Sequence, residues 1–447
     1  MIDLRDYQVR FLADLRSAFA AGHRRVLGVS PTGSGKTVCA AAMAVGAVER
    51  GGRVLFAAGR RELIDQTAAT FAAAGLADLR VIQGKRDDGP PDAPVIIGSI
   101  QTLCQDRWLG ALPQVGLAIL DECHHGAAAT WADLVRSQPG ARWAGLTATP
   151  ERADGKPLGD LFDVLVPGPT VRSLTDAGRL VPCRIWAGPS TLKPGELAMT
   201  PLEAYQRFAS GRRAAVFCRD VAHARAELAV FHGADVSCGL VTGAMPDTQR
   251  AATLAAWRAG DTLVVVSVGV LTEGFDLPEL GVAILARRFS HAGQYLQVAG
   301  RILRPAPGKS EAALVDLTGC AHEHGPVELE REYSLTGRAI GGGARDSFGH
   351  CSACGSMFLY GPHACPHCGA EIPVRPRPAP RNVNAGVSEL TPARPRIPWV
   401  SALLAKYDGH CAKCGGWFPR GTPVYSVAGK RGSTRHQRCP LPSVASP

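Results

Sequence analysis

The 447-residue sequence lacks any apolar run of the ~18 residues needed to cross a membrane. Its first residues, MIDLRDYQVRFL, include acidic side chains and show no apolar run before a small-residue cleavage site, so we expect no signal peptide. A reducing cytoplasm and no membrane partner are the resulting expectations. Charged residues make up only 20% and hydrophobic residues 46%, which favours a globular chain over a disordered one.

The charge and the cysteines gather near the C-terminus. The net charge is +10, and residues 371–447 carry 12 basic and three acidic residues, which points to an acidic partner such as nucleic acid. Seven of the 14 cysteines lie in the last hundred residues, in CxxC or HxxC pairs. Such pairs suit a metal better than a disulfide framework.

Short apolar segments alternate with helical patterns in two parts of the chain, which predicts parallel sheets covered by helices on both faces. The expected strands of the first part are 26–29, 54–57, 95–97, 115–120 and 143–146. Those of the second part are 214–218, 238–241, 262–267, 282–285 and 313–317. The two parts share an architecture without a sequence repeat.

A phosphate-binding loop is predicted at SPTGSGKT, residues 30–37, between a strand and a helix. Backbone N–H groups and the helix N-terminus would face the phosphates of ATP. Lys36 would reach the β- and γ-phosphates, and the Thr37 hydroxyl would bind Mg²⁺. A turn without chemistry is the alternative, which GKT after a strand disfavours. The predicted nucleotide-binding residues of this loop are Ser30, where the general pattern has glycine, Gly33, Ser34, Gly35, Lys36 and Thr37.

Two carboxylates, Asp121 and Glu122, follow an apolar segment and should emerge at the carboxyl end of a strand, where α/β sheets bind ligands. Asp121 could hold Mg²⁺ through water, and Glu122 could orient and deprotonate the attacking water. We interpret His124 as a hydrogen-bonding sensor between ATP and the opposite lobe. The DEC motif is weak evidence alone and strong evidence beside the phosphate-binding loop.

Four further motifs resemble those of superfamily-two DExH/DEAD-like helicases, in the branch with phage and bacterial DEAD/DEAH-type helicases and Rad25-like motors. They are LRDYQ at 4–8, LTATPERADG from Leu146, VLTEGFDLP at 270–278 and QYLQVAGRILRP at 294–305. The resemblance extends from Leu4 to about Gly319, with the motifs in the family's order. It implies two RecA-like lobes, ATP hydrolysis and a nucleic-acid partner.

The resemblance also implies roles for single residues. Contacts to the γ-phosphate across the cleft would come from a second-lobe helix, and an arginine finger of this kind accelerates hydrolysis by roughly 10³ to 10⁵. A surface helix with two solvated arginines is the alternative for GRILR. The implied residues are Arg5 and Gln8 for adenine, Thr147 and Thr149 for coupling, Gly274 and Asp276 facing ATP, and Gln297, Arg301 and Arg304 at the γ-phosphate.

By position in the family, the nucleic-acid strand would cross the tops of both lobes. Most such contacts go to phosphates and carry no sequence information. The residue before the first contact is Gly59, where the family commonly has proline. The implied contacts are Arg60, Ser99, Gln101, Arg219 and Thr272.

Two cysteine clusters follow the second lobe. The first has two CxxC pairs ten residues apart, which predicts a closed structural Zn²⁺ site at Cys351, Cys354, Cys365 and Cys368. The second resembles treble-clef or ribbon-like Cys₃His modules, with Cys411, Cys414, His436 and Cys439 as ligands. Basic and aromatic residues around it favour a tail that grips nucleic acid, although a solvated surface and a site for a protein partner are the alternatives.

The sequence as a whole predicts an α/β protein with two tandem RecA-like parallel-sheet lobes, followed by small zinc-binding modules. We expect an ATP-dependent helicase that uses ATP, Mg²⁺ and Zn²⁺ and acts on DNA rather than RNA. The alternatives are a duplex translocase without strand separation, as in restriction or repair, and an ATP-gated adaptor that recruits partners through its zinc tail. The expected parts are lobe 1 at 1–168, a linker at 169–200, lobe 2 at 201–340, a Cys₄ ribbon at 348–372, a Pro/Arg-rich linker at 373–397 and a second zinc module at 398–442.

Overall fold

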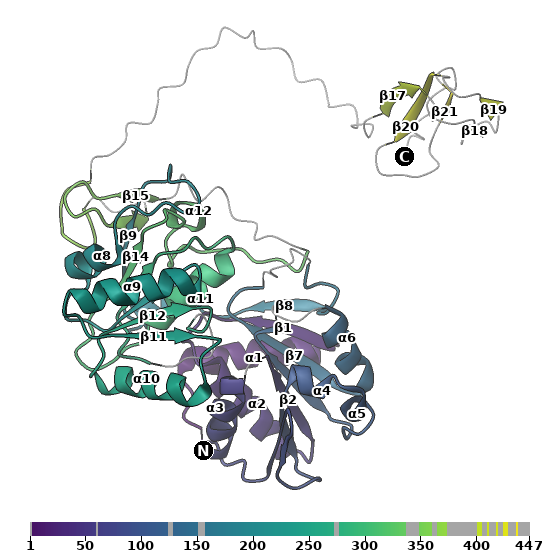
Figure 1. Ribbon diagram of the computed structural model, residues 1–447. Helices are drawn as coiled ribbons and strands as arrows, with labels where there is room; N and C mark the ends of the chain where they lie inside the picture. Colours follow the sequence, from purple (N-terminus) through teal and green to yellow (C-terminus); the bar gives the residue numbers. More distant parts are fainter. Residues whose placement is uncertain are drawn as a thin grey trace. The chain divides into compact units, whose positions relative to one another are not determined.

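The computed structural model shows two compact units, residues 1–374 and 375–447 (Figure 1). The structure describes residues 2–59, 61–123, 128–150, 157–271, 277–336, 348–359 and 364–372, together with five short strands between residues 400 and 436. None of the helices in these segments combines the length and the apolar composition that a membrane span requires.

Lobe 1 is built on an eight-stranded sheet with the order β4-β3-β5-β2-β6-β7-β1-β8. All neighbours pair in parallel except β3 and β4, which are antiparallel. The strands are β1 (Arg25–Val29), β2 (Val54–Ala58), β3 (Leu79–Gln83), β4 (Arg86–Asp88), β5 (Val95–Ser99), β6 (Leu117–Asp121), β7 (Arg142–Thr147) and β8 (Val164–Pro167). The helices are α1 (Asp6–Ala20), α2 (Lys36–Val48), α3 (Arg61–Ala73), α4 (Ile100–Leu103), α5 (Asp106–Leu109) and α6 (Ala128–Ser137).

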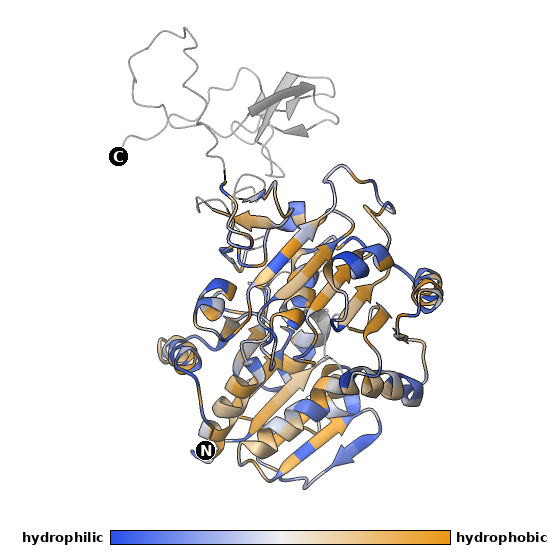
Figure 2. Cartoon of the chain, turned by 90° about the vertical axis from the view of Figure 1, so that its left-hand side faces the viewer, coloured by the Kyte–Doolittle hydropathy of each residue, from blue (hydrophilic) through white to orange (hydrophobic). Residues whose placement is uncertain are grey.

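The strands of lobe 1 are apolar on both faces because helices cover both faces. Val26 of β1 packs with Phe56 and Ile97 on one face, and the next residue, Leu27, packs with Leu55 and Ile96 on the other. Figure 2 shows the same arrangement as a hydrophobic sheet between helices with hydrophilic outer surfaces. The phosphate-binding loop follows directly after the C-terminal end of β1.

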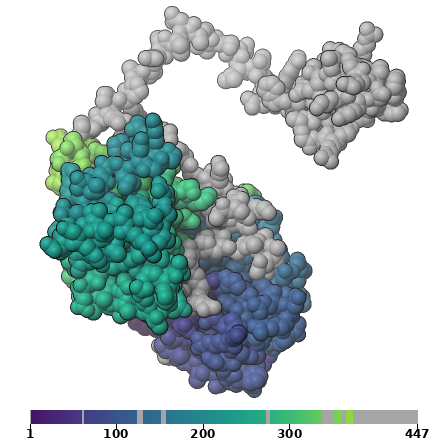
Figure 3. All heavy atoms as spheres, viewed as in Figure 1, coloured from purple at the N-terminus to yellow at the C-terminus, as the bar shows by residue number. Residues whose placement is uncertain are grey.

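Lobe 2, teal to green in Figure 3, has a six-stranded parallel sheet with the order β11-β12-β10-β13-β14-β9. Its strands are β9 (Cys183–Ala187), β10 (Ala214–Phe217), β11 (Cys238–Thr242), β12 (Val264–Val268), β13 (Val282–Leu285) and β14 (Ala312–Asp316). The helices from the end of lobe 1 onward are α7 (Val171–Asp176), α8 (Pro201–Phe208), α9 (Val221–Gly233), α10 (Asp247–Ala259), α11 (Ala292–Ile302) and α12 (Ala321–His324).

Several helices of this region begin where the sequence offers a capping side chain. Thr200 accepts a hydrogen bond from the Glu203 backbone N–H at the start of α8, and Thr170 does the same for Ser173 at the start of α7. Asp220 caps α9 by accepting from His223 N. Local chemistry therefore fixes these helix starts.

The prediction of an α/β fold with two RecA-like parallel-sheet lobes is confirmed. Strands β3, β4, β8 and β9 were not among the expected strands. Residues 169–200, predicted as an inter-lobe linker, contain α7 and β9, and β9 is the edge strand of the lobe 2 sheet.

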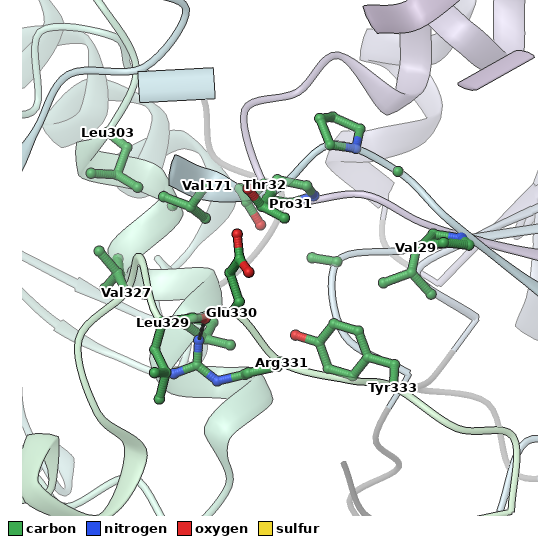
Figure 4. A pocket seen from close by; sticks show the side chains of 18 residues that line it. Val29, Pro31, Thr32, Val171, Leu303, Val327, Leu329, Glu330, Arg331 and Tyr333 are labelled. Carbon is green, nitrogen blue, oxygen red and sulfur yellow. Dashed lines mark hydrogen bonds between the residues drawn. The ribbon is translucent and has the colours of Figure 1, made fainter. Parts of the chain in front are cut away.

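A strap of residues 326–336 returns from lobe 2 to lobe 1. Val327 belongs to the lobe 2 core, whereas Tyr333 and Leu335 pack against the lobe 1 core, and the Leu335 carbonyl accepts a 2.9 Å hydrogen bond from Gly159 N. The strap closes an apolar cavity of about 120 Å³ behind the phosphate-binding loop, into which Glu330 points (Figure 4). Within the described residues, the chain therefore passes between the lobes once between β8 and β9 and again at this strap.

After the strap come β15 (Phe348–His350) and β16 (Met357–Leu359), which pair in antiparallel fashion. In the second unit, β17 (Val400–Leu404), β20 (Pro423–Val427) and β21 (Arg435–His436) form one sheet, and β18 (Gly409–His410) pairs with β19 (Trp417–Phe418).

Candidate nucleotide site between the two lobes

The phosphate-binding loop connects the buried strand β1 to the N-terminus of α2. Gly33 and Gly35 have φ values of +89° and +83°, in the left-handed region that favours glycine. Ser30, at the first position of the loop, donates its hydroxyl hydrogen bond to Ser34 Oγ over 2.7 Å, and both side chains are buried. Serine at this position therefore fits the loop and closes it with a side-chain bond.

Lys36 and the two carboxylates after β6 meet beside this loop. Lys36 Nζ donates to the Ser30 carbonyl over 3.2 Å and lies 3.7 Å from Glu122 Oε1. Glu122 has φ +47°, a strained value for a non-glycine residue, and its N–H donates to Asp121 Oδ1 over 3.1 Å. The structure thus brings together Ser30, Lys36, Asp121 and Glu122.

Asp121 is almost fully buried, and its electrostatic environment favours a cation. Burial and the neighbouring Glu122 raise the pKa of Asp121 to about 7, while Lys36 opposes the shift. Two adjacent carboxylates offer the hard oxygen ligands that Mg²⁺ prefers, and Thr37, the further predicted ligand, follows Lys36 in the first turn of α2. The donor set fits Mg²⁺, and a bound divalent ion would restore the ionised form of Asp121.

The N-terminal motif lies directly against the phosphate-binding loop. Tyr7 Oη and Gln8 Nε2 donate to the same carbonyl oxygen, that of Ser34, over 3.0 and 3.1 Å. Gln8 Oε1 accepts from the Arg5 N–H over 3.0 Å, and a cavity of about 380 Å³ opens beside Arg5, Tyr7 and Arg10. Tyr7 was not among the predicted site residues. Its place one residue before Gln8 in LRDYQ was the available signal.

Thr147 and Thr149 connect the loop to lobe 2. Ser30 N donates to the Thr147 carbonyl over 2.9 Å, and Thr149 N donates to Thr147 Oγ1 over 3.2 Å. Thr149 is buried, and a Cβ atom on Gly293 of α11 would lie 2.8 Å from its Oγ1. The turn after β7 therefore touches the loop on one side and α11 on the other.

Helix α11 lies against the phosphate-binding loop. A Cβ atom on Gly300 would lie 2.4 Å from Thr32 Cβ, and one on Gly33 would lie 3.6 Å from Arg304 Cγ. Gln297 is buried within α11, and burial lowers the pKa of Arg304. The helix that carries Gln297 and Arg301, and the Arg304 that follows it, thus face the loop predicted to hold the phosphates.

Comparisons with known proteins show which families this chain resembles. Residues 1–152 match the family described as "Type III restriction enzyme, res subunit", and residues 199–306 match "Helicase conserved C-terminal domain". The chain is 27% identical to a 51.5 kDa protein of a Lactococcus phage (isolate 7-9) over 77% of this chain and 75% of that protein. It is 29% identical to the DNA 3'-5' helicase XPB of Mycobacterium tuberculosis over 68% of this chain and 58% of that protein.

A solved structure of Saccharomyces cerevisiae Dbp5 bound to RNA and ADP BeF3 superimposes with a TM-score of 0.52 at 14% identity, over 74% of this chain and 93% of that one. At this identity the likeness concerns the fold alone. The two family models together match more than half of the chain, and on that ground the chain belongs to the superfamily-two DExH-like helicases. Helicases of this family generally use ATP and Mg²⁺, in agreement with the donor set around Lys36.

Some predicted residues of this helicase lie outside the described residues. They are His124, Arg60, Thr272, Gly274, Asp276, Cys411, Cys414 and Cys439, while His436 is known only as part of β21. Among the predicted strand contacts, Ser99 is buried and its hydroxyl lies 2.7 Å from Thr102 Oγ1. Gln101 is exposed and donates to the Gly59 carbonyl over 2.9 Å, and Arg219 pairs with Asp220. Ser99 is thus engaged internally, while Gln101 and Arg219 are accessible.

The first cysteine cluster of the helicase forms one compact group. The sulfur atoms of Cys351, Cys354, Cys365 and Cys368 all lie within 4.8 Å of one another. Gly355 and Gly369 end the two CxxC turns at φ +71° and +73°. Four thiols in this arrangement fit a tetrahedral Zn²⁺ site, as the spacing predicted.

This cluster docks on β9, the edge strand of lobe 2. Trp186 Nε1 donates to the Cys354 carbonyl over 3.3 Å, and Arg184 donates to the His367 carbonyl over 2.9 Å. Met357 joins the lobe 2 core. The rings of His350, directly before the first cysteine, and His322 of lobe 2 lie 5.1 Å apart. The sequence carried no signal for this docking.

Proposed function

We propose that the chain is an ATP-dependent nucleic-acid helicase that acts on DNA and couples ATP hydrolysis to closure of its two lobes. The observation that carries the proposal is the contact between α11 and the phosphate-binding loop, where Gly300 meets Thr32 and Arg304 meets Gly33. A change in the bound phosphates would therefore alter the contacts of both lobes at this point.

In the proposed reaction, Lys36 exchanges its contacts with Ser30 and Glu122 for the β- and γ-phosphates. Thr37 and Asp121 would hold Mg²⁺, which would neutralise phosphate charge. Glu122 orients the attacking water and accepts its proton. The strained φ of Glu122 supports this role, because strained backbone is common at catalytic positions.

Lobe 2 completes the site in this proposal. Arg301 and Arg304 stabilise charge on the γ-phosphate, and Gln297 positions them or the water. Gly274 and Asp276 remain predicted ATP contacts. Arg5, Tyr7 and Gln8 recognise the adenine. The attachment of Tyr7 and Gln8 to the Ser34 carbonyl, and of the Arg5 N–H to Gln8, supports this role. Hydrolysis then releases lobe 2 from the loop, so that the chemical step drives movement of the lobes.

DNA is the proposed substrate because the mycobacterial relative is named a DNA helicase and the N-terminal match is to a restriction-enzyme subunit. The latter also favours the second candidate, a translocase that moves along duplex without separating it. RNA is the competing substrate, since the structurally similar Dbp5 was solved with RNA.

We further propose that residues 348–372 form a structural zinc ribbon at Cys351, Cys354, Cys365 and Cys368. Residues 398–442 would form a second module with Cys411, Cys414, His436 and Cys439 as ligands. The basic tail around it would grip nucleic acid, with recruitment of a protein partner as the alternative.

Two assays on the same protein separate helicase from translocase. A helicase releases a labelled strand from forked DNA in the presence of ATP, whereas a translocase displaces the third strand of a triplex and leaves the fork intact. Lys36→Ala should lose both activities. Lys85→Ala, which removes an exposed lysine outside the phosphate-binding loop, is the matched control. If the protein hydrolyses ATP but releases neither strand, the result would favour the alternative of an ATP-gated adaptor.

A further inference from the structure

Lobe 1 carries an open groove of about 610 Å³ that the nucleotide site does not use. Strands β2, β6 and β7 begin beside it, and Arg53, Leu117 and Arg142, at or just before their first residues, line it. These strands are parallel neighbours, so their amino ends meet at one edge of the sheet. The phosphate-binding loop follows the carboxyl end of β1, so the groove lies at the opposite edge of the lobe 1 sheet.

Two helices supply the apolar floor of this surface, which we call the amino-edge groove. Helices α1 and α2 lie side by side (Figure 1), and both end near this edge of the sheet. Most of the floor packs on the lobe 1 core and is only partly buried, so the core reaches the surface here. Apolar side chains left open at a concave surface are typical of a binding site. The floor consists of Leu15, Phe19, Ala42, Met43 and Ala47.

Glycines leave the amino-edge groove unobstructed. A Cβ atom on Gly140 would meet no atom within 4 Å beyond its chain neighbours, and one on Gly116 would come no closer than 4.0 Å to the Arg53 carbonyl oxygen. Outside its own helix backbone, a Cβ atom on Gly46 of α2 would reach only the Arg50 guanidinium, at 3.5 Å. The guanidinium of Arg50 therefore lies beside the floor without closing it.

The rim of the amino-edge groove is basic. It contains Arg16, Arg50, Arg53 and Arg142, and its described lining residues include no aspartate or glutamate. Within the part of the chain that the structure describes, none of the four arginines has a carboxylate at ion-pair distance. The ends of α1 and α2 contribute a partial charge of about −0.5 each, which four arginines exceed. The groove should therefore attract anionic groups.

An apolar floor inside a basic rim matches a particular kind of partner. A protein segment with leucine or phenylalanine on one face and aspartate or glutamate beside it would cover both parts of the groove, as amphipathic helices do in grooves between helices. Nucleic acid matches it less well, because phosphates would pair with the arginines and leave the floor uncovered. Bases stack on aromatic side chains, and Phe19 is the one aromatic residue among the described lining residues.

We propose that the amino-edge groove of lobe 1 docks an acidic amphipathic segment of a partner protein. The apolar side chains of the segment contact Phe19 and Met43, whose flexible thioether adapts to different shapes. Its carboxylates pair with Arg16 and Arg50 at the rim. Because the groove and the nucleotide site lie at opposite edges of the sheet, the docked segment leaves the nucleotide site open. This surface is separate from the zinc tail and does not depend on the proposed helicase activity.

The first test uses the full chain and a fluorescent peptide of about 16 residues, long enough for roughly four helical turns. The peptide carries leucine and phenylalanine on one helical face and aspartate or glutamate elsewhere. A peptide of the same composition with its apolar residues scattered around the helix should bind about tenfold more weakly or worse in fluorescence anisotropy, because it cannot bury its anchors together. Equal binding of the two peptides would overturn the proposal, since attraction to a basic chain would then explain both.

A second test places a carboxylate in the groove. Gly140→Glu adds it where a Cβ atom meets nothing, and it should weaken binding of the amphipathic peptide by about tenfold through repulsion. Gly110→Glu is the matched control, because Gly110 is an equally open, exposed position of lobe 1 outside the groove. The control should stay within about twofold of wild type. Equal affinities of the two variants would overturn the proposal and would be expected if the peptide binds the basic second unit.

A third test separates a protein partner from nucleic acid. Arg16→Ala/Arg50→Ala should weaken binding of the amphipathic peptide by about tenfold near 0.1 M salt and leave affinity for single-stranded DNA within about twofold. Lys85→Ala/Arg225→Ala, which removes two exposed cations outside the groove, should leave both affinities within about twofold.

A loss of DNA affinity at least as large as the loss of peptide affinity would assign the groove to nucleic acid and overturn the proposal. ATP hydrolysis without peptide should be the same in all these variants and in wild type. Failure of the docking proposal therefore leaves the proposed function intact, whereas wild-type protein that hydrolyses no ATP would contradict the proposed function alone.

Discussion

Lys309 places an ammonium group among three main-chain carbonyl oxygens of lobe 2. Its Nζ donates to Pro278, Leu280 and Arg304 over 2.8, 2.6 and 2.7 Å. The bonds tie the segment after the VLTEGFDLP motif to the residue that faces the phosphate-binding loop. Burial, together with Arg212 and Arg304, lowers the pKa of Lys309 to about 7.

Lys309→Met should destabilise the protein by about 2 to 4 kcal/mol, because three carbonyls lose their donor. Denaturant unfolding measures the loss, and Lys85→Met, at an exposed position, should change stability by less than about 0.5 kcal/mol. An equal effect of the two substitutions would show that the three bonds contribute nothing.

The contribution of Lys309 should also depend on pH. Its pKa is about 7 in the folded protein and about 10.4 in the unfolded chain, so the unfolded chain binds more protons between these values. The free energy of unfolding of the wild type relative to Lys309→Met should therefore rise with pH, by up to about 1.4 kcal/mol per pH unit above pH 7. A difference that stays constant from pH 6 to pH 9 would contradict this reasoning.

Helix α11 is the element on which communication between the lobes depends. Gly300 allows it to approach the loop, since a Cβ atom there would meet Thr32 Cβ at 2.4 Å. The first atom of a side chain cannot rotate away, so an added Cβ must displace either α11 or the loop that carries Thr32.

Gly300→Ala should lower kcat for ATP hydrolysis by about 10²-fold, as expected for a misplacement of catalytic groups by roughly 1 Å. The helix itself should persist, because alanine favours helices. Gly233→Ala at the end of α9, where a Cβ atom would meet nothing within 4 Å, is the control and should leave kcat unchanged. Normal turnover in Gly300→Ala would mean that the lobes act without this contact.

The strands and loops differ in how far the sequence reveals them. The buried strands β1, β6 and β12 were expected from their apolar runs, and so was the phosphate-binding loop, whose chemistry is local. Strand β9 was missed because Arg184 and Trp186 interrupt its apolar residues, and both side chains bind carbonyl groups of the cysteine cluster, which lies far away in the sequence. The role of Lys309 was missed because two of its three hydrogen-bond partners, Pro278 and Leu280, lie far from it in the sequence.

Across the whole molecule, most of the net positive charge lies outside the two lobes. Residues 375–447, the second unit, hold 12 basic and two acidic residues, whereas the net charge of the full chain is +10. The first unit, with both lobes, is therefore close to neutral. In the proposed function, the lobes would hold nucleic acid through individually placed side chains, and general attraction would come from the second unit.

Removal of residues 375–447 should leave ATP hydrolysis without nucleic acid unchanged and weaken binding to DNA by at least about tenfold near 0.1 M salt. The salt dependence of binding should become less steep, because fewer counterions are released. Unchanged affinity at several salt concentrations would show that the tail is a solvated surface or a site for another protein.

Metal content offers a test of the first zinc module within the full chain. Replacing Cys351 and Cys354 by serine should remove about one equivalent of zinc, since two of four ligands are lost. Because Met357 packs in the lobe 2 core, the same change should also lower the unfolding temperature. Cys104→Ser, in lobe 1 and outside the cluster, should retain all the metal. Full zinc content in the double variant would contradict the assignment.

The central claim, an ATP-driven motor on nucleic acid, is tested most directly by ATP hydrolysis of the full chain with single-stranded, duplex and forked DNA and with RNA. The account predicts hydrolysis that DNA stimulates more than RNA and that Lys36→Ala and Glu122→Gln abolish. Absence of ATP hydrolysis with every one of these nucleic acids would contradict it.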